Sequence, residues 1–375
     1  MLKTAKNIII GGGIAGLTTA YHLMKAGESV AVIEADTIGC RASSKAAGMV
    51  TPASEVHLGE NHLMDCFMDS CHYYKSFIEE LCSGKPEEVD FNRSGSLMCA
   101  LDHDGQAELT RLKDFQQSMG LNLEELTKNQ VLELEPHLSH NIRYAIYAKN
   151  EAYVDNWLLL EKLKTVLLDG GVQVIEHQPL QKVSFEGSQV KEITVGKTEL
   201  TTLKPERLII TTGLDLIPDL QTRLNWPLRA VKGQVITLQA PEQVLSRPVR
   251  IYHRYPIYLV PRKDGRILVG ATSEEFSDED STAGGVMDLL YASWRALPAI
   301  YDYPLLDTTA GLRPATKDHH PIIGKTQVEG LYVLSGLYRH GIMAAPYLSQ
   351  QLANLILGED TKLEWDMFSL DRETL

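Results

Sequence analysis

The stretch from Asn7 to Glu34 constrains the fold more than any other part of the sequence. Its letters, NIIIGGGIAGLTTAYHLMKAGESVAVIE, describe an apolar strand, a glycine turn, an amphipathic helix and a second apolar strand that ends in an acid. This order is one complete βαβ unit with the GxGxxG spacing of a dinucleotide-binding turn. The sequence therefore predicts an α/β domain of the Rossmann type at the start of the chain.

The glycines of this turn have separate physical roles. Gly11 permits the tight turn, Gly13 lets the backbone approach a pyrophosphate, and Gly16 lets the helix pack closely on the strand. The N–H groups of the first helical turn, at Ile14 and Ala15, then face the phosphate charge together with the positive end of the helix dipole. We expect all five residues to contact a dinucleotide.

Glu34 follows the last of these glycines by 34 − 16 = 18 residues. A carboxylate about 20 residues after the motif accepts hydrogen bonds from a ribose diol. Because an acid at this position repels a 2′-phosphate, the predicted cofactor is FAD or NAD and not NADP. A glycine turn that merely connects strand to helix is the alternative, and it does not account for the acid.

Length and charge exclude several classes of protein. The 375 residues suffice for two domains, and the net charge of −13 argues against binding a nucleic acid, which is itself a polyanion. No run is long enough for a membrane helix, and the first strand begins too early for a signal-peptide core. Five scattered cysteines without metal-ligand spacing favour a reducing compartment. We therefore expect a cytoplasmic protein without an integral membrane segment or a metal site.

Three further regions carry candidate ligand contacts. Residues 39–53 are rich in small side chains, which suit a segment that lies along an extended ligand. Residues 207–213, RLIITTG, read as an apolar strand that ends beside the cofactor. Residues 331–346, LYVLSGLYRHGIMAAP, predict a strand, a turn and a helix whose N-terminus at Gly341 and Ile342 offers N–H groups to an anionic oxygen.

The middle of the chain has a different pattern. Residues 233–272 alternate in the manner of an antiparallel sheet with a hairpin turn at 263–266, and this indicates a second domain. Before this block, Thr127 and Gln130 have the spacing of a capping box that starts a short helix at 127–135. Residues 144–154 are expected to form one strand.

Several motifs together resemble the D-amino acid oxidase superfamily of flavoproteins, and within it the glycine oxidases. They are GGGIAG with Glu34, SSKAAGM at 43–49, YLVPRKDGRILVGAT at 258–272, AGLRPATKDHHPIIG at 310–324 and GLYRHGIMAAP at 336–346. The resemblance implies an α/β fold in which a Rossmann-like FAD-binding domain is interleaved with a substrate domain built on a mixed, largely antiparallel sheet. The implied boundaries are 1–84, 150–222 and 308–375 for FAD, and 85–149 and 223–307 for substrate.

The resemblance also implies which residues contact FAD. The implied contacts are Gly11, Gly13, Ile14, Ala15, Gly16, Glu34, Ala35, Arg41, Ala42, Ser43, Ala46, Ala47, Gly48, Met49, Val174, Thr212, Gly213, Gly311, Arg339, His340, Gly341, Ile342 and Met343.

Three residues are implied to bind the substrate: Arg313, Tyr258 and Arg339. A guanidinium group matches a carboxylate through two parallel hydrogen bonds, so Arg313 would fix the orientation of an amino acid. Tyr258 would donate to the same carboxylate, and Arg339 would lie close by. The competing interpretations are a structural ion pair for Arg313 and packing for Tyr258.

The implied reaction is hydride transfer from the Cα atom of a small amino acid to FAD, with oxygen as the acceptor. The imine then hydrolyses to an oxo acid, and no general base is assigned. A dehydrogenase that passes electrons to a quinone or protein partner, and a flavin-containing assembly subunit, remain as alternatives, whereas NAD alone does not explain the C-terminal motif. Lys45, His319 and His320 receive no role here, and the side chain of His340 receives none beyond its implied FAD contact. A homo-oligomer remains an option.

Overall fold

The computed structural model describes residues 5–56, 60–253 and 256–373. The chain forms two compact units, and each unit is assembled from segments far apart in the sequence. The first unit consists of Met1–Ser44, Trp157–Val231 and Arg313–Leu375, and the second consists of Lys45–Asn156 and Lys232–Leu312.

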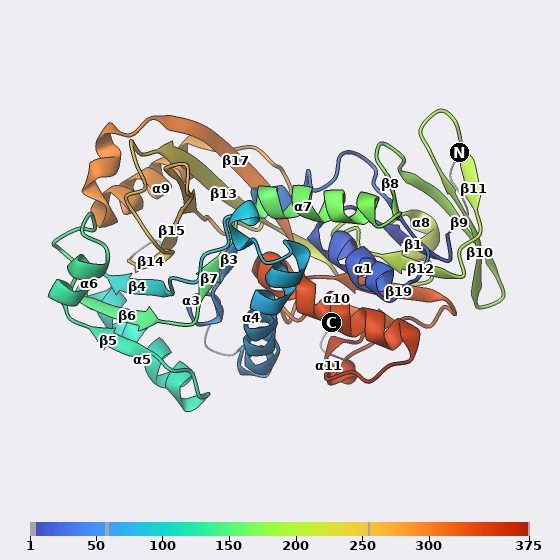
Figure 1. The fold of residues 1–375 in the computed structure, drawn as a ribbon, viewed down its shortest axis with the longest axis horizontal. Coiled ribbons are helices and arrows are strands. Elements are labelled where there is room, and N and C mark those ends of the chain that lie inside the picture. The colour runs from blue at the N-terminus through green and yellow to red at the C-terminus, as the bar shows by residue number, and fades with distance from the viewer. Residues whose placement is uncertain (1–4, 57–59, 254–255, 374–375) are drawn as a thin grey trace. The chain divides into compact units, whose positions relative to one another are not determined.

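A six-stranded sheet forms the centre of the first unit. Its spatial order is β18 (Ile322–Lys325), β19 (Leu331–Ser335), β12 (Arg207–Ile210), β1 (Asn7–Ile10), β2 (Val30–Ile33) and β8 (Gln173–Ile175). Figure 1 labels β1, β8, β12 and β19 of this sheet. Neighbouring strands are parallel except for the antiparallel pair β18 and β19. Because parallel strands end at the same edge of a sheet, the turns after β1, β2, β12 and β19 meet at one edge.

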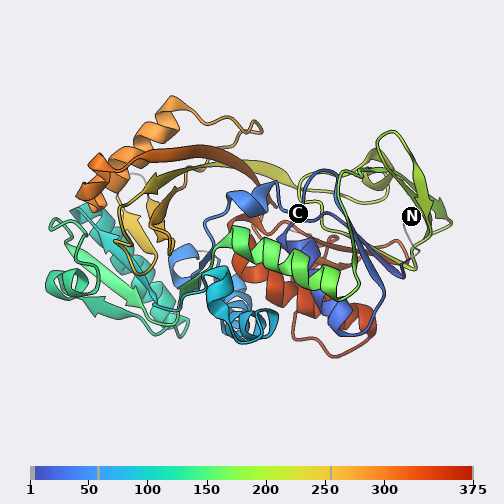
Figure 2. The same ribbon diagram turned by 45° about the horizontal axis from the view of Figure 1, so that its top comes forward.

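Two layers cover this sheet. The helices α1 (Ile14–Lys25), α7 (Asn156–Asp169) and α10 (Gly341–Leu357) run beside one another in Figures 1 and 2. The hydroxyl groups of Thr18 and Ser349, 2.7 Å apart and buried, join α1 to α10. On the opposite face, Ile8 and Ile10 share one apolar core with a three-stranded antiparallel sheet. Its strands are β9 (Leu180–Glu186), β10 (Gln189–Val195) and β11 (Thr201–Leu203). Shorter elements of this unit are α2 (Ala42–Lys45), α8 (Pro218–Gln221), η3 (Tyr338–His340) and α11 (Trp365–Phe368).

An eight-stranded mixed sheet dominates the second unit. Its order is β17 (Leu305–Ala315), β13 (Arg229–Gln239), β16 (Arg266–Gly270), β15 (Ile257–Pro261), β14 (Val249–Tyr252), β4 (Ser96–Ala100), β6 (Tyr144–Ala148) and β5 (Glu124–Leu126). The pair β4 and β14 is parallel, whereas the other pairs whose register is described are antiparallel. The block at 249–270 therefore extends a sheet that also contains strands from much earlier in the chain.

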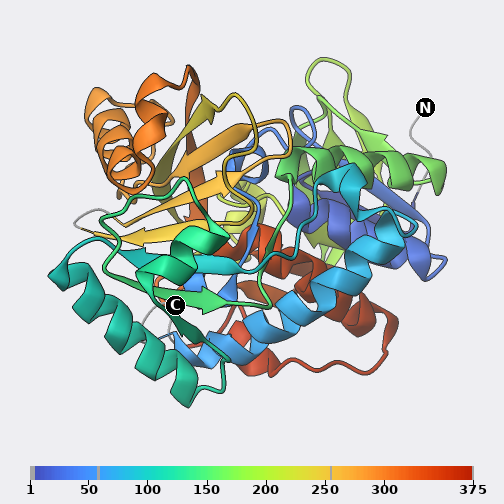
Figure 3. The same cartoon turned by 60° about the vertical axis from the view of Figure 1, so that its left-hand side comes forward.

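The two faces of this sheet have different partners. The helix α9 (Ala283–Ala296), orange in Figure 3, lies against one face of the sheet. It packs Leu289 and Ala292 into a core that includes Ile236 and Leu259. Tyr258 alternates with Leu259 and so points to the other face. That face carries the short pair β3 (Met49–Val50) and β7 (Ala152–Tyr153). The remaining elements are α3 (Pro52–Glu55), α4 (Asn61–Leu81), η1 (Pro86–Val89), α5 (His103–Ser118), α6 (Lys128–Leu134) and η2 (Pro298–Asp302).

This architecture confirms the predicted α/β fold with a mixed, largely antiparallel second sheet. The capping box is also confirmed, because Thr127 caps α6 reciprocally with Gln130. The single strand expected at 144–154 is wrong: β6 ends at Ala148, and after a turn β7 pairs with β3 in a separate sheet. Within the described ranges, no helix combines the length and apolarity needed to cross a bilayer.

Candidate active site

The glycine turn after β1 has the geometry that its sequence predicts. Gly11 adopts a positive φ of 109°, and a Cβ atom on Gly16 would lie 1.9 Å from the carbonyl oxygen of Gly11. Neither position therefore accepts a side chain without a backbone shift. Gly13 precedes α1 in an extended conformation, and the first turn of the helix contains no acidic residue. The helix N-terminus thus fits a pyrophosphate, which needs N–H donors and a positive dipole end.

The segment after β2 closes around this turn. The Glu34 carboxylate accepts hydrogen bonds from the N–H groups of Gly12 at 2.7 Å and Asp36 at 2.9 Å. The Ser43 hydroxyl accepts from the N–H group of Ile14 at 3.0 Å. Ala35, Arg41 and Ala42 belong to the same connection, in which the exposed Arg41 guanidinium lies 3.4 Å from the Asp36 carboxylate. The structure therefore gathers these predicted contacts at the start of α1.

Val174 lies in β8, the edge strand beside β2, where it pairs with Val32. The N–H group of Glu34 donates to the carbonyl oxygen of Ile175, the residue that follows Val174, at 2.8 Å. The backbone at Val174 is consequently one strand away from the predicted ribose-binding acid.

A second helix begins at the same edge of the sheet. After β19, Gly336 takes a positive φ and η3 leads into α10 at Gly341. The buried His340 precedes α10 without capping it through its side chain, so Gly341, Ile342 and Met343 form an uncapped first turn. Thr212 and Gly213 follow β12 beside this turn, and the Ser335 hydroxyl donates to the carbonyl oxygen of Gly213 at 3.1 Å. Two helices therefore begin along one edge of one sheet, and neither is capped by the side chain of its own N-cap residue.

Three arginines reach this edge within the first unit. Arg313 is half-buried near the end of β17, and a Cβ atom on Gly213 would contact the next residue, Pro314, at 3.8 Å. Arg339 lies over the Tyr338 ring, with 4.9 Å from its Cζ atom to the ring centroid. Arg229 approaches the same group of side chains through His319, with 3.5 Å between Nη2 and Nε2.

The unassigned histidines have different surroundings. The rings of His319 and Tyr338 stack with their centroids 4.8 Å apart, which connects Arg229 to the turn that carries Arg339. His320 instead lies toward Asp318, with 3.9 Å between Nδ1 and Oδ2. Asp318 also binds Arg372 at 2.8 Å. Sequence reasoning missed Arg229, because nothing in PLRAVKG distinguishes it from a surface arginine.

In the second unit, the structure brings Tyr258 together with part of the predicted flavin segment. Tyr258 is 8% exposed and shares a small cluster with Ala47, while the half-buried Met49 packs against that cluster. Its hydroxyl lies over Gly270, where an added Cβ atom would be 2.4 Å away. The predicted substrate tyrosine and the predicted flavin contacts are thus neighbours on one face of the sheet.

The buried side chain of Arg262 binds the backbone of the segment that contains Ala47. It is 1% exposed, and its Nη2 atom donates to the Ala47 carbonyl oxygen at 2.9 Å and the Asn156 side-chain oxygen at 3.2 Å. Burial lowers the pKa of Arg262, while the Asp155 carboxylate, 3.3 Å from its Nε atom, favours the charged form. Gly48 fits only as glycine, because its φ is 77° and a Cβ atom would lie 1.9 Å from the Val154 carbonyl oxygen. Ala46 precedes this anchored segment.

The short helix α3 continues the same segment into a buried polar cluster. The Glu151 carboxylate accepts from the Ala53 N–H group at 2.5 Å and also from the Ser96 hydroxyl. Burial raises the pKa of Glu151 to about 8, so this carboxyl is largely protonated at neutral pH. At the end of α3, Glu55 pairs with Arg250 at 3.0 Å. Sequence reasoning missed these buried groups, as well as Arg262.

Lys45 and Gly311 are also neighbours in the second unit. A Cβ atom on Gly311 would lie 2.8 Å from the Lys45 Cβ atom, so glycine leaves room for the lysine stem. Lys45 therefore packs against β17, the strand that carries Arg313 two residues later. Among the described residues, no group of His, Cys, Asp and Glu has the arrangement of a metal site.

Comparisons with known proteins agree with this geometry. A family model described as FAD dependent oxidoreductase matches residues 6–355. The chain is 28% identical to the glycine oxidase of Bacillus subtilis strain 168, over 100% of this chain and 99% of that protein. It is 31% identical to a putative thiamine biosynthesis oxidoreductase ThiO of Rhizobium etli, over 95% and 98%. The crystal structure of glycine oxidase from Geobacillus kaustophilus superposes with a TM-score of 0.89 at 28% identity, over 98% and 99%.

The observed cradle fits the cofactor that this match requires. Two helix starts, a strand-end glutamate and a glycine turn supply the donors and acceptors that an extended dinucleotide needs. The chain therefore belongs to the family of FAD dependent oxidoreductases, as its motifs predicted, and FAD is its cofactor.

Proposed function

We propose that the chain oxidises a small amino acid, such as glycine, sarcosine or a small D-amino acid, with oxygen as the acceptor. The products would be an oxo acid, ammonia or an amine, and hydrogen peroxide. The observation that carries the proposal is the group of arginines, Arg229, Arg313 and Arg339, at the strand-end edge where the dinucleotide turn also lies. The glycine oxidases among the relatives support the same substrate class.

The proposed roles follow from the chemistry of the side chains. Arg313 would bind the substrate carboxylate bidentately, and Tyr258 would donate a further hydrogen bond to it. Arg339 would add positive charge near the same anion. Bound FAD supplies the acceptor for the hydride that leaves the substrate Cα atom. The substrate amine would bind in its neutral form, so orientation replaces a protein base in this proposal.

We extend the proposal to the division of labour between segments. Residues 1–84, 150–222 and 308–375 would hold FAD, and residues 85–149 and 223–307 would shape the substrate pocket. This division follows ligands and not compactness, so 45–84 is assigned to FAD although it belongs to the second compact unit. Ala47, Gly48 and Met49 support the assignment, because Arg262 fixes their backbone beside Tyr258.

Anaerobic reduction of the bound flavin tests the proposal. The FAD-loaded protein is mixed with glycine, sarcosine, D-alanine and other N-methyl amino acids without oxygen, and absorbance near 450 nm is followed. Air is then admitted and peroxide is measured. The proposal predicts bleaching by at least one of these substrates and rapid recovery with one peroxide per flavin.

Other outcomes assign other functions. Bleaching that does not recover in air, but does recover with a quinone or an artificial dye, indicates a dehydrogenase. If no amino acid bleaches the flavin, and Arg313→Met behaves as the wild type with every ligand, the chain is a flavin-containing assembly subunit and the proposal is wrong.

A further inference from the structure

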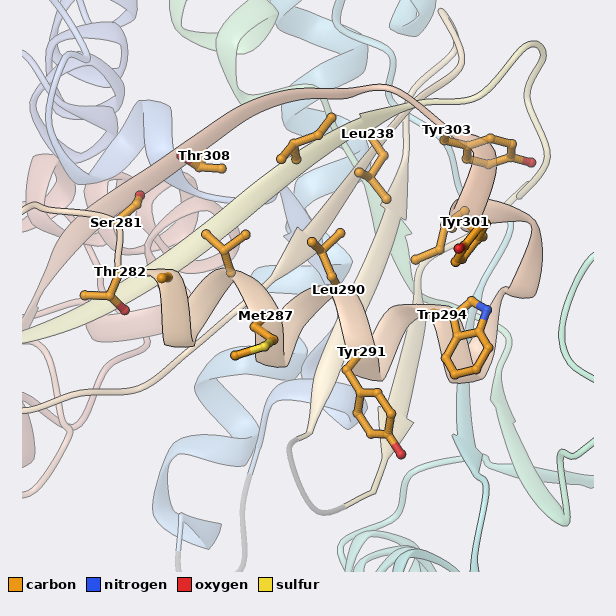
Figure 4. Close-up of a pocket in the computed structure, with 14 residues that line it drawn as sticks. Leu238, Ser281, Thr282, Met287, Leu290, Tyr291, Trp294, Tyr301, Tyr303 and Thr308 are labelled. Carbon is orange, nitrogen blue, oxygen red and sulfur yellow. The ribbon is translucent and has the colours of Figure 1, made fainter.

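A groove without charged side chains opens beside α9 in the second unit (Figure 4). Its volume is about 730 Å³, and α9, η2, β13 and β17 contribute its walls. The lining consists of Leu238, Ser281, Thr282, Ala283, Val286, Met287, Leu290, Tyr291, Trp294, Ile300, Tyr301, Tyr303, Leu305 and Thr308. Charged residues make up 23% of the chain, so a lining of this size without any is a marked local deviation.

The helix beside this groove has two apolar faces. One face, with Leu289, Ala292 and Ala296, is buried against the sheet. Met287, Tyr291 and Trp294 recur four and three residues apart and form a second stripe. In Figure 4, Leu290 points toward the strands, whereas Tyr291 points away from them. A helix that is apolar on two faces needs a second partner.

Exposed apolar side chains are concentrated at this place. Among the described residues, seven of the eleven exposed large apolar side chains fall between 276 and 306. Tyr301 is 82% exposed, and Met287 is 65% exposed. A patch of this kind on a folded chain indicates an interaction surface.

We propose that this groove is the contact surface for a second copy of the chain, related to the first by a twofold axis. The patch contains both a projecting side chain, Tyr301, and the groove that would receive it. In a twofold contact each copy supplies both features, so such a patch is self-complementary. Aromatic residues and methionine are also the types that are enriched in protein interfaces.

The exposed apolar area of this patch is close to what one partner contributes to a standard protein interface. Met287, Tyr291, Trp294, Tyr301, Leu305 and Leu306 are between 44% and 82% exposed. With about 200 Å² for each such side chain, they present about 670 Å² of mainly apolar surface. A standard interface takes roughly 800 Å² from each partner, and the polar surroundings of the groove supply the remainder.

The net charge of the chain also favours contact through this groove over contact through charged surface. Each copy carries a net charge of −13, which opposes association over most of the surface. The lining of the groove is uncharged, so contact between two linings brings no like charges together, and Arg295, which lies over the Tyr291 ring, is a cation. Salt screens the long-range repulsion and leaves apolar contact intact, so association should strengthen between 50 and 500 mM NaCl.

Sedimentation velocity of the FAD-loaded full chain tests this proposal. The wild type should sediment with at least twice the monomer mass of 41.8 kDa. The double variant Met287→Glu and Tyr301→Glu places like charges in the contact and should weaken association at least about a hundredfold. Leu200→Glu is the matched control, because Leu200 is 62% exposed but lies in the first unit.

The readings have distinct meanings. The proposal is supported if the double variant sediments with half the mass of the wild type, keeps a normal flavin content, and the Leu200→Glu control keeps the wild-type mass. This holds whether the wild type is a dimer or a tetramer. A monomeric wild type overturns it, as does a double variant that assembles like the wild type or an association that weakens with salt. A monomer whose groove binds the probe anilinonaphthalene sulfonate, with loss of binding in the double variant, would show a small-ligand site instead.

Discussion

At the scale of single residues, Glu34 is the residue that we propose accepts hydrogen bonds from the ribose of the cofactor. Glu34 directly follows β2. Its carboxylate lies against the glycine turn, 2.7 Å from the N–H group of Gly12. We expect Glu34→Gln to weaken FAD binding by about ten- to a hundredfold, because hydrogen bonds to a charged group contribute roughly 1.5–3 kcal/mol each. Titration of the apoprotein with FAD, followed by flavin fluorescence, measures this change.

Asp36→Asn is the control for this titration, because its carboxylate is half-exposed and lies beside Arg41 and not at the turn. If the two variants bind FAD equally well, Glu34 does not hold the ribose.

Arg262 gives the second prediction at this scale. Arg262→Met removes the donor to the Ala47 carbonyl oxygen and leaves the buried Asp155 with Arg266 as its remaining described arginine partner. Breaking a buried ion pair costs about 3–5 kcal/mol when one charge stays behind. We therefore expect a lower free energy of unfolding in urea by about 3 kcal/mol, together with weaker flavin retention. The neighbouring Lys263→Met, which changes an exposed lysine, should unfold as the wild type, and equal midpoints for the two variants would contradict this role.

Some of these residues could be predicted from the sequence and others could not, because only some of them depend on local spacing. Gly11 and Glu34 act through local geometry, so their spacing alone predicted their placement. Arg250 and Glu55 are 195 residues apart, and Glu151 and Ser96 are 55 apart. A buried pair of this kind depends on which strands become neighbours, and nothing in the local pattern of either residue announces its partner.

At the scale of elements, the short helix α3 depends on a neutral carboxyl. Burial raises the pKa of Glu151 from an ordinary value of 4.5 to about 8. The folded chain thus keeps a proton that the unfolded chain releases, and the free energy of unfolding falls as the pH rises from about 4.5 to about 8. Glu151→Gln cannot ionise, so we expect it to match the wild type near pH 5 and to exceed it near pH 8, by at most a few kcal/mol.

Urea unfolding at several pH values measures this difference. Glu186→Gln, at a side chain that is 75% exposed, should show no such trend relative to the wild type. A constant difference between Glu151→Gln and the wild type from pH 5 to pH 8 would show that Glu151 is ionised in the folded chain.

Elements were predictable where their signals are local. The capping box of Thr127 and Gln130 fixed the start of α6. The sequence predicts a helix over 106–120, whereas α5 begins at His103, where Asp102 caps it by accepting from the Gly105 N–H group at 2.8 Å. The division of 144–154 into β6 and β7 depends on their separate partners, β4 and β3, and a strand pattern alone does not contain this information.

At the scale of the whole molecule, the two kinds of sheet were predictable and the strand order of the second sheet was not. The βαβ unit at 7–34 predicted a parallel sheet, and the alternating block at 233–272 predicted an antiparallel one. The insertion of β4 beside β14 follows from long-range parallel pairing, which no periodicity reveals. β17 was also not predicted as a strand, because DTTAGLRPA lacks alternation, and as an edge strand it needs only one strand partner, β13.

The central claim is that a dinucleotide fold presents Arg313 to the carboxylate of an amino acid. Titration of the FAD-loaded protein with acetate, followed by the shift in flavin absorbance, tests it without turnover. We predict saturable binding by the wild type, a loss of about a hundredfold in affinity for Arg313→Met, partial retention by Arg313→Lys, and no change for Arg223→Met, whose guanidinium lies over the Phe185 ring. Equal acetate affinities for the wild type and Arg313→Met would contradict the account.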